Sequence, residues 1–260
     1  MNTGERPVAN SFETLSSLMQ ETYKLCRKYI KDKNVLDVGC GEGIVDLYLS
    51  DVVGHITGID VCQKVVDKAN KMFSGKNITF CKMSGEKLAF AAESFDVVIA
   101  SQSIEHIKND DKFVSEVYRV LKNNGIFVCT TPNKLSLVPS GEKLYDAPFY
   151  PFHIREYTPD QFYGLLEKYF EEVAKKCFYN PDRSLKLIKS FRAKLIYRMS
   201  RFRIIRHIGR VLPLRIKGFI VYFNQKELKS EDVGTAFCDF HDNLDFIPEN
   251  LCGICRKVGT

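Results

Sequence analysis

A glycine-rich segment directly after an apolar run constrains this chain more than any other feature. Residues 37–43 read Asp-Val-Gly-Cys-Gly-Glu-Gly, follow Val35 and Leu36, and precede a stretch with helical spacing. Glycine lets a backbone turn sharply and approach a ligand closely, which a side chain would prevent. Twenty-one residues after Gly39, Asp60 ends a second apolar run, where a carboxylate can accept hydrogen bonds from both hydroxyls of a ribose. The segment therefore predicts a strand, a tight turn and a helix that together bind a nucleoside.

Apolar runs alternate with stretches of helical spacing over the first two thirds of the chain. Such alternation predicts a parallel sheet with helices on both faces, with ligands bound at the carboxyl ends of the strands. A helix through residues 113–121 is expected to begin after Asn109 and to stop at Asn124 and Gly125. The other candidate helices span residues 12–31 and 158–169, and the candidate strands span residues 35–38, 55–59, 78–80, 95–100, 126–129 and 251–257.

The spacing of the glycines separates two kinds of nucleotide site. A dinucleotide fingerprint places its third glycine three residues after the second, whereas Gly43 follows Gly41 by two. An acidic residue, Asp37, also stands two positions before the first glycine. The pattern favours a nucleoside site without a pyrophosphate cradle, and it disfavours a nicotinamide-dependent oxidoreductase.

Three further segments follow the glycine loop in a recognisable order. They are residues 95–100 (Phe-Asp-Val-Val-Ile-Ala), 103–107 (Ser-Ile-Glu-His-Ile) and 119–125 (Arg-Val-Leu-Lys-Asn-Asn-Gly). Together the four motifs, over roughly residues 30–133, resemble those of the class I S-adenosylmethionine-dependent methyltransferases. The resemblance implies an enzyme with an α/β fold, namely a Rossmann-like, doubly wound, mostly parallel seven-stranded sheet, and it implies S-adenosylmethionine as the cofactor.

The same resemblance assigns cofactor-binding residues by position. Asp37, Gly39 and Gly41 would line the methionine and ribose part, Asp60 would hold the ribose hydroxyls, and Val61 would lie beside the adenine. Ser84-Gly85 stands where family members often carry Asp-Ala, so the usual carboxylate contact to the adenine amine is missing. The residues predicted to bind the cofactor are Asp37, Gly39, Cys40, Gly41, Gly43, Asp60, Val61, Ser84, Gly85, Ser101 and Gln102.

Glu105 and His106 are the first candidates for catalysis. Methyl transfer from a sulfonium chiefly needs alignment, and a hydroxyl acceptor also needs a base, for which histidine is suited near neutral pH. The pair resembles the Glu-His of the ubiquinone-pathway O-methyltransferases, in which a glutamate three residues before the pair helps to bind a divalent metal. Gln102 stands at that position, so no metal is predicted. Alternatively, Glu105 and His106 only cap their loop.

His153 is the second candidate base. It lies in residues 148–157, where two prolines stiffen the chain and aromatic residues can form the wall of an acceptor pocket. The stretch from His153 to Thr158, with residues 131–133, resembles methyltransferases of glycan, natural-product and lipid pathways. Alternatively, this loop packs on the core, with His153 and Glu156 satisfying backbone groups.

Cysteine and histidine near the end of the chain permit two interpretations. Cys238 with His241, and Cys252 with Cys255, have the spacing of zinc knuckles. Residues 251–257 also read as the final strand of the sheet, in which residues three apart point to opposite faces. A strand and a zinc site cannot both hold without distortion.

The positive charge of the chain is concentrated in one segment. Twelve Lys or Arg and no Asp or Glu lie between Arg183 and Lys217, which leaves 26 basic against 32 acidic residues elsewhere. The segment also carries apolar residues at three- or four-residue steps, so an anionic membrane or a lipid-linked acceptor is favoured over nucleic acid. A cap helix packed on the domain is the alternative. We therefore predict a methyltransferase core over 1–180, a basic helical insertion or cap over 181–227, and a strand region over 228–260 that completes the sheet.

The sequence thus predicts methyl transfer to a hydroxyl of a small molecule, glycan or lipid-linked intermediate. The alternative is a catalytically weak binding protein of the same fold that docks on membrane or RNA through its basic segment. No run approaches the roughly 20 apolar residues of a membrane span. Residues 1–7 do not resemble a secretory signal, and nine scattered cysteines read as reduced thiols. A cytoplasmic location is expected, with membrane association through the basic segment as an option; the oligomeric state is not predicted.

Overall fold

The computed structural model describes residues 16–73, 77–138, 143–150, 152–179, 236–240 and 248–259. Strands and helices alternate as the sequence predicts. The helices are α1 (Ser17–Cys26), α2 (Ile44–Leu49), α3 (Gln63–Phe73), α4 (Asp110–Val120) and α5 (Pro159–Glu167), with short 3₁₀ helices η2 (Ile104–His106) and η3 (Lys134–Leu137). The strands are β1 (Asn34–Val38), β2 (His55–Asp60), β3 (Ile78–Lys82), β4 (Phe95–Ser101), β5 (Leu121–Pro132), β6 (Glu172–Tyr179), β7 (Ala236–Asp239) and β8 (Asn250–Arg256).

All of these strands join one sheet, in the order β3-β2-β1-β4-β5-β8-β6-β7. The strands from β3 to β5 in this order pair in parallel, whereas β8 is antiparallel to β5 and β6, and β7 is antiparallel to β6. The predicted doubly wound, mostly parallel sheet is confirmed. Seven strands form the predicted sheet, and the four-residue strand β7 adds an eighth at its edge. Crossovers leave β1 toward β2 and return to β4 on its other side, so the topological switch point lies at the carboxyl end of β1.

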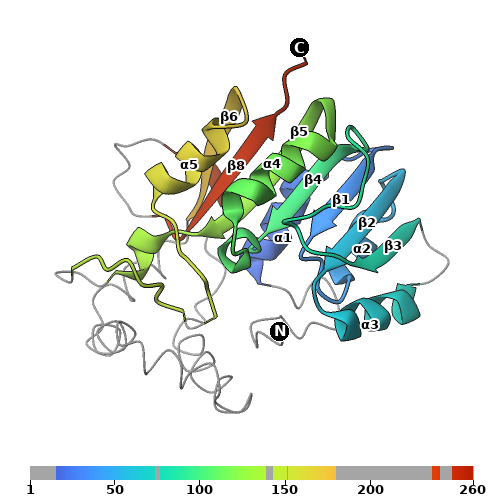
Figure 1. Cartoon of the computed structure of the whole chain (residues 1–260), viewed down its shortest axis with the longest axis horizontal. Helices are drawn as coiled ribbons and strands as arrows, with labels where there is room; N and C mark the ends of the chain where they lie inside the picture. Colours follow the sequence, from blue (N-terminus) through green and yellow to red (C-terminus); the bar gives the residue numbers. More distant parts are fainter. Residues whose placement is uncertain are drawn as a thin grey trace.

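Two hydrophobic cores lie on the two faces of the sheet. One contains the apolar faces of α4 and α5, including Phe113 and Phe162, and the other contains those of α1, α2 and α3, including Val45 and Val66. Figure 1 shows α4 and α5 on the near side of the sheet and α1 behind it. Strands buried on both faces explain the continuous apolar runs in the sequence.

Side-chain caps define the starts of the two near-side helices. Asn109 accepts a hydrogen bond from the Lys112 backbone at 2.9 Å, and Thr158 forms a reciprocal capping box with Gln161. The expected end of α4 at Asn124 and Gly125 is wrong. The helix ends at Val120, because the buried Leu121 already pairs with Phe95 and begins β5.

The described strand region excludes a zinc site that uses both Cys252 and Cys255. These two residues lie in β8 and point to opposite faces, so that each is buried in a different core. Burial raises the pKa of both thiols, for Cys252 to about 12, which disfavours the thiolates that zinc needs. Cys238 falls within β7, and His241 lies outside the described residues. The strand interpretation is therefore confirmed.

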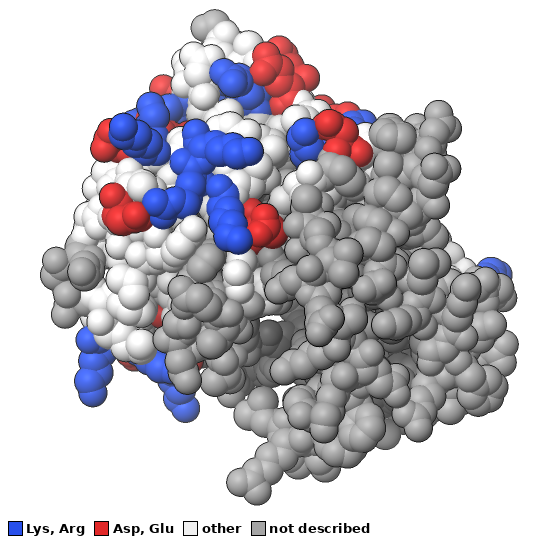
Figure 2. Space-filling model, turned by 180° about the vertical axis from the view of Figure 1, so that it is seen from behind, with Lys and Arg blue, Asp and Glu red and all other residues white. Residues whose placement is uncertain are grey.

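Charges on the described surface are mixed. Figure 2 shows acidic side chains close to the Lys and Arg side chains on the face seen from behind. Some opposite charges are paired, for example Arg27 with Asp51 at 2.8 Å and Lys176 with Asp239 at 2.5 Å. The basic segment from Arg183 to Lys217, like the helical insertion proposed over 181–227, lies outside the described residues. No helix in the described part of the chain is long and apolar enough to cross a membrane.

Two glycines provide a test of how α5 packs on the sheet. A Cβ atom on Gly253 of β8 would lie 2.3 Å from Cδ1 of the buried Leu166, whereas one on Gly164 of α5 would meet nothing within 4 Å. We expect Gly253→Ala to lower the free energy of unfolding by about 1–3 kcal/mol through overpacking. Gly164→Ala should raise it by about 0.5–1 kcal/mol, because alanine loses less conformational entropy in a helix. Urea unfolding of both variants measures the difference, and equal effects would contradict this packing.

Candidate active site at the carboxyl ends of the strands

The glycine loop, residues 39–43, turns between β1 and α2 in a conformation that favours glycine. Gly39, Gly41 and Gly43 have φ angles of +83°, +58° and +76°. L-residues with side chains rarely adopt this region, so each glycine is required by the backbone itself. A Cβ atom on Gly39 would lie 2.4 Å from the Ser103 hydroxyl, and one on Gly43 would lie 2.3 Å from the Phe80 ring.

Hydrogen bonds from neighbouring strands hold this loop. The backbone N–H groups of Gly39 and Cys40 donate to the Ile59 carbonyl of β2, at 2.8 and 3.1 Å. The Ser103 hydroxyl, just after β4, donates to the Val38 carbonyl at 2.8 Å. The carboxyl ends of β1, β2 and β4 are thereby joined into one rigid floor.

The loop leaves room for a ligand where the family would place S-adenosylmethionine. A Cβ atom on Gly41 would meet no atom within 4 Å, so its backbone borders open space. Val61, at the end of β2, is an apolar side chain that is 54% exposed, as expected of a surface that an adenine would cover. These residues fit the cofactor that the sequence predicts.

Asp60 and Asp37 end neighbouring strands on either side of the loop floor. Asp60 is buried, and its Oδ1 accepts a hydrogen bond from the Cys62 backbone at 2.8 Å, which orients the carboxylate. Asp37 is also buried and accepts a hydrogen bond from the Tyr23 hydroxyl of α1 at 3.3 Å. The helix before the first strand thus reaches the carboxyl end of β1 through Tyr23.

The remaining predicted contacts divide into packing and surface positions. Cys40 is buried against Gly58, and burial raises the pKa of its thiol well above the usual value, so it does not serve as a nucleophile. Gly85 is buried, and a Cβ atom there would lie 2.9 Å from the Phe113 ring, whereas its neighbour Ser84 is exposed. The described structure therefore makes Gly85 a packing position and leaves Ser84 open to a ligand.

Ser101 and Gln102 connect the end of β4 to β5. Gln102 has a positive φ of 51°, its backbone N–H donates to the Thr130 carbonyl at 3.0 Å, and its side-chain amide donates to the Thr130 hydroxyl at 3.2 Å. Thr130 also donates to the Ser101 hydroxyl at 3.4 Å. A glutamine donating to Thr130 does not replace the metal-binding glutamate of the ubiquinone-pathway pattern.

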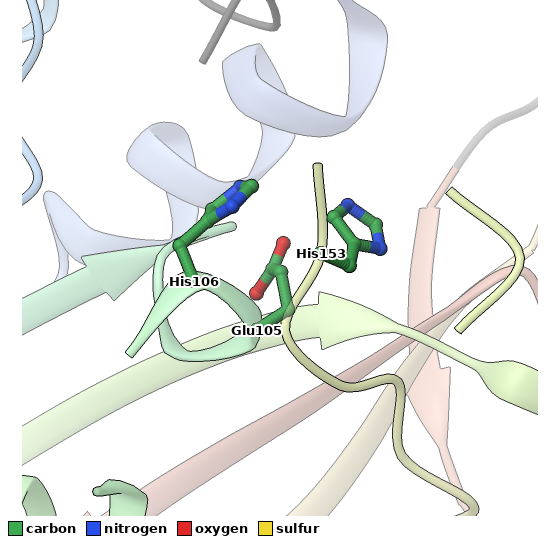
Figure 3. A group of neighbouring side chains, drawn as sticks. All are labelled: Glu105, His106 and His153. Carbon is green, nitrogen blue, oxygen red and sulfur yellow. The ribbon is translucent and has the colours of Figure 1, made fainter. Parts of the chain in front are cut away.

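The two separate sequence candidates for catalysis meet at one site. Glu105 and His106 lie in η2, and His153 lies in the loop before α5; Figure 3 shows the Glu105 carboxylate between the two imidazole rings. The ring centroids are 5.1 Å apart at an interplanar angle of 77°. Ligand atoms of the three side chains lie within 4.8 Å of one another, close enough to bind one small polar group or an ion.

Backbone hydrogen bonds hold the two segments together. The Glu105 carbonyl accepts hydrogen bonds from the backbones of Ile154 and Arg155, at 2.9 and 3.3 Å, and its carboxylate accepts one from the Thr131 hydroxyl at 3.0 Å. Because η2 begins directly after Ser103, which contacts the glycine loop, the histidine cluster is tied to the cofactor side of the site.

Each histidine has a fixed partner at Nδ1. His106 Nδ1 donates to the Phe152 carbonyl at 3.3 Å, and His153 Nδ1 lies 3.1 Å from the Glu156 carboxylate. Because a carbonyl can only accept, Nδ1 of His106 carries a proton, and the neutral form of this ring has its lone pair on Nε2. Glu156 also accepts the backbone N–H groups of Phe149 and Tyr150, which is the role that the packing alternative for this loop gives to Glu156.

Sequence reasoning missed two residues of this region, Tyr23 and Asp46, which lie beside Asp37. Asp46 had a visible signal, because it is an acidic residue within the apolar run Ile44-Val45-Asp46-Leu47. Tyr23 had none, since only the fold brings α1 next to Asp37. Thr131, which the sequence placed only within the resemblance of residues 131–133, donates to Glu105.

Comparisons with known proteins agree with the geometry. A family described as "Methyltransferase domain" matches residues 36–129. The chain is 31% identical to a Mycolicibacterium smegmatis protein named "Probable S-adenosylmethionine-dependent methyltransferase/" over 174 residues, covering 64% of this chain and 63% of that protein. It is 26% identical to a ubiquinone biosynthesis O-methyltransferase of a Ruegeria strain, covering 52% and 58%. A solved structure, YcgJ of Bacillus subtilis, superposes with a TM-score of 0.55 at 19% identity, covering 92% and 99% of the two chains.

The chain is therefore similar to S-adenosylmethionine-dependent methyltransferases, and its residues 36–129 match a methyltransferase domain. S-Adenosylmethionine is the cofactor of such enzymes, and the glycine loop described above lies within the matched residues. The chain spans less than two thirds of the length of these curated relatives.

Replacing the Asp60 carboxylate should test the cofactor assignment. We expect Asp60→Asn to weaken binding of S-adenosylhomocysteine about 10- to 100-fold, because a charged hydrogen-bond acceptor is lost. Titration calorimetry measures the affinity. Asp67→Asn, an exposed substitution in α3 where the carboxylate bonds Gln63 at 2.8 Å, serves as the control. Unchanged affinity in Asp60→Asn would remove Asp60 from the cofactor site.

Proposed function

We propose that this protein transfers a methyl group from S-adenosylmethionine to a hydroxyl of a small-molecule, glycan or lipid-linked acceptor. The observation that carries the proposal is the convergence of Glu105, His106 and His153 beyond the carboxyl end of β4. A hydroxyl acceptor must lose a proton when it is methylated, and an oriented imidazole can accept that proton. The cluster therefore suits a hydroxyl better than a carbanion-like acceptor.

The cofactor would be held by the floor of the glycine loop. Asp37, Gly39 and Gly41 would face its methionine and ribose parts, Asp60 would accept the ribose hydroxyls, and Val61 would cover the adenine. The bound cofactor supplies an electrophilic methyl group on a positively charged sulfur. The open space beside Gly41 supports a close approach of the cofactor to the backbone of the loop.

His106 is proposed as the general base. Its ring is half-buried and therefore more accessible to an acceptor than His153, which is 4% exposed. With Nδ1 donating to the Phe152 carbonyl, Nε2 is the atom that accepts the hydroxyl proton. The Glu105 carboxylate beside the ring would stabilise the imidazolium that forms.

His153 and Glu156 are proposed to position the acceptor side of the site. The Glu156 carboxylate holds His153 and two backbone N–H groups at once, so it fixes the loop and the ring together. Such an arrangement keeps a polar group in a defined place without a cost of ordering it when the acceptor binds. Ser101 and Gln102 would border the reacting centre.

The basic segment from Arg183 to Lys217 remains a sequence-based part of the proposal. Its charge and apolar spacing support docking on an anionic membrane surface next to a lipid-linked acceptor. The competing proposal is a binding protein of this fold with weak catalysis. The pairing of opposite charges on the described surface supports locating the docking function in the basic segment.

Labelled methyl transfer tests the function itself. Incubation with methyl-labelled S-adenosylmethionine and a cell extract that includes membranes should place label in an extracted product, as a methyl ether by mass spectrometry. Label in the organic phase would support a lipid-linked acceptor, and label in the aqueous phase a soluble one. Cofactor binding with no labelled product from any extract would instead support the binding protein.

Removing the proposed base should separate chemistry from binding. We expect His106→Ala to lower kcat about 10²- to 10⁴-fold, because proton removal contributes that range, while the affinity for S-adenosylhomocysteine stays unchanged. His55→Ala is the control: His55 begins β2 at the opposite end of the sheet and bonds Thr79 at 3.0 Å.

A chelator distinguishes this mechanism from one that uses a metal at the same residues. Because Gln102 stands where the metal-binding pattern has a second glutamate, and donates to Thr130, we expect turnover to persist in EDTA. Loss of turnover in EDTA with recovery on adding Mg²⁺ would assign Glu105, His106 and His153 to a metal instead. For the previous variant, an unchanged kcat in His106→Ala would contradict the role of His106 as the general base.

A further inference from the structure

Asp46 of α2 is a carboxyl group in an environment that ordinarily excludes one. Its side chain is fully buried, and neither carboxylate oxygen has a hydrogen-bond donor among the described residues. Asp37 Oδ1 is the other buried side-chain oxygen without a donor in that part of the chain. An ionised carboxylate left without donors in the interior is strongly disfavoured.

Both carboxyl groups are buried, and they are close enough for each to shift the pKa of the other. Two carboxylates are both acceptors, so a hydrogen bond between them requires a proton on one of them. A proton on Asp46 lets that residue donate to Asp37, which then accepts from Asp46 and from the Tyr23 hydroxyl. This single assignment gives Asp37 a second donor and leaves one negative charge, on Asp37.

We propose that Asp46 is a positioning residue for the cofactor: as a neutral hydrogen-bond donor it holds Asp37 as a carboxylate at the base of the glycine loop. The inference rests on the proposed function for its ligand, S-adenosylmethionine. A carboxylate there favours the positively charged sulfonium of the cofactor over the neutral thioether of the product, S-adenosylhomocysteine. The pair would thus promote exchange of spent product for fresh cofactor.

The surrounding groups assign the relevant proton to the pair. Tyr23 and Cys26 face it from α1, Cys40 faces it from the glycine loop, and Asp60 acts on Asp37 from the end of β2. Burial raises the pKa of Tyr23, Cys26 and Cys40 well above their usual values, so these three stay neutral near pH 7.

The pKa values of Asp37 and Asp46 are raised to different extents and by different neighbours. Burial and the neighbouring Asp37 raise the pKa of Asp46 well above its usual value. Burial raises the pKa of Asp37 to about 7, with hydrogen bonds from Tyr23 and Asp46 opposing the shift. Asp37 therefore gains a proton as the pH falls below about 7 and loses it above, while Asp46 keeps its proton.

The test compares affinities for S-adenosylmethionine and S-adenosylhomocysteine by calorimetry, without any acceptor, between pH 6 and 8. In the wild-type protein, the preference for the sulfonium ligand should rise about threefold or more with pH, because Asp37 becomes charged. Asp46→Asn should keep this profile, since the amide still donates. Asp46→Leu should lose about threefold or more of the preference at pH 7.5, because Asp37 loses a donor and its ionised form is disfavoured.

Other outcomes would overturn the proposal. A flat wild-type profile means that Asp37 does not titrate against the ligand charge. A weaker preference in Asp46→Asn means that Asp46 itself is charged, and an unchanged preference in Asp46→Leu means that Asp46 only fills space. Should Asp46→Leu not fold, Asp46→Ala takes its place in the experiment, because alanine also removes the donor. Since no acceptor is present, failure of the O-methylation proposal would leave these readouts unaffected.

Discussion

The glycine loop depends on hydrogen bonds that reach it from the strands on both sides. The Ile59 carbonyl at the end of β2 accepts two backbone N–H groups of the loop, and Ser103 beyond β4 donates to the Val38 carbonyl. These contacts fix the position of a loop in which three glycines adopt left-handed conformations. The same Ser103 leads directly into η2, so the loop also sets where the histidine cluster lies.

The buried carboxyl groups on the cofactor side and on the acceptor side of this floor have different hydrogen-bond partners. On the cofactor side, Asp37 and Asp46 are buried together and need a shared proton, because two adjacent carboxylates cannot both be ionised in the interior. On the acceptor side, the Glu156 carboxylate is fully engaged by His153 and two backbone N–H groups. A cationic ligand suits the first arrangement, and a neutral acceptor that gives up a proton suits the second.

Much of the fold was predictable because parallel strands carry their signal locally. Strands buried on both faces need continuous apolar runs, and β1, β2, β4 and β5 show them. Strand pairing overrides a local signal at α4, which ends before Asn124 because Leu121 joins β5. The strand β7 is too short to give a local signal of its own. The burial of Cys252 and Cys255 of β8 in two different cores also decided between the strand and the zinc site, which the sequence had left as alternatives.

The sequence by itself determined the fold class and the cofactor, and it predicted the glycine loop and Asp60 as cofactor-binding positions, since each motif is a short segment of the chain. It proposed His106 and His153 as separate alternatives, 47 residues apart. Only the tertiary structure decided that they share one site, because the Glu105 carbonyl binds the loop that carries His153. It likewise brought Tyr23 and Asp46 to Asp37, through contacts between α1, β1 and α2 that no local pattern encodes.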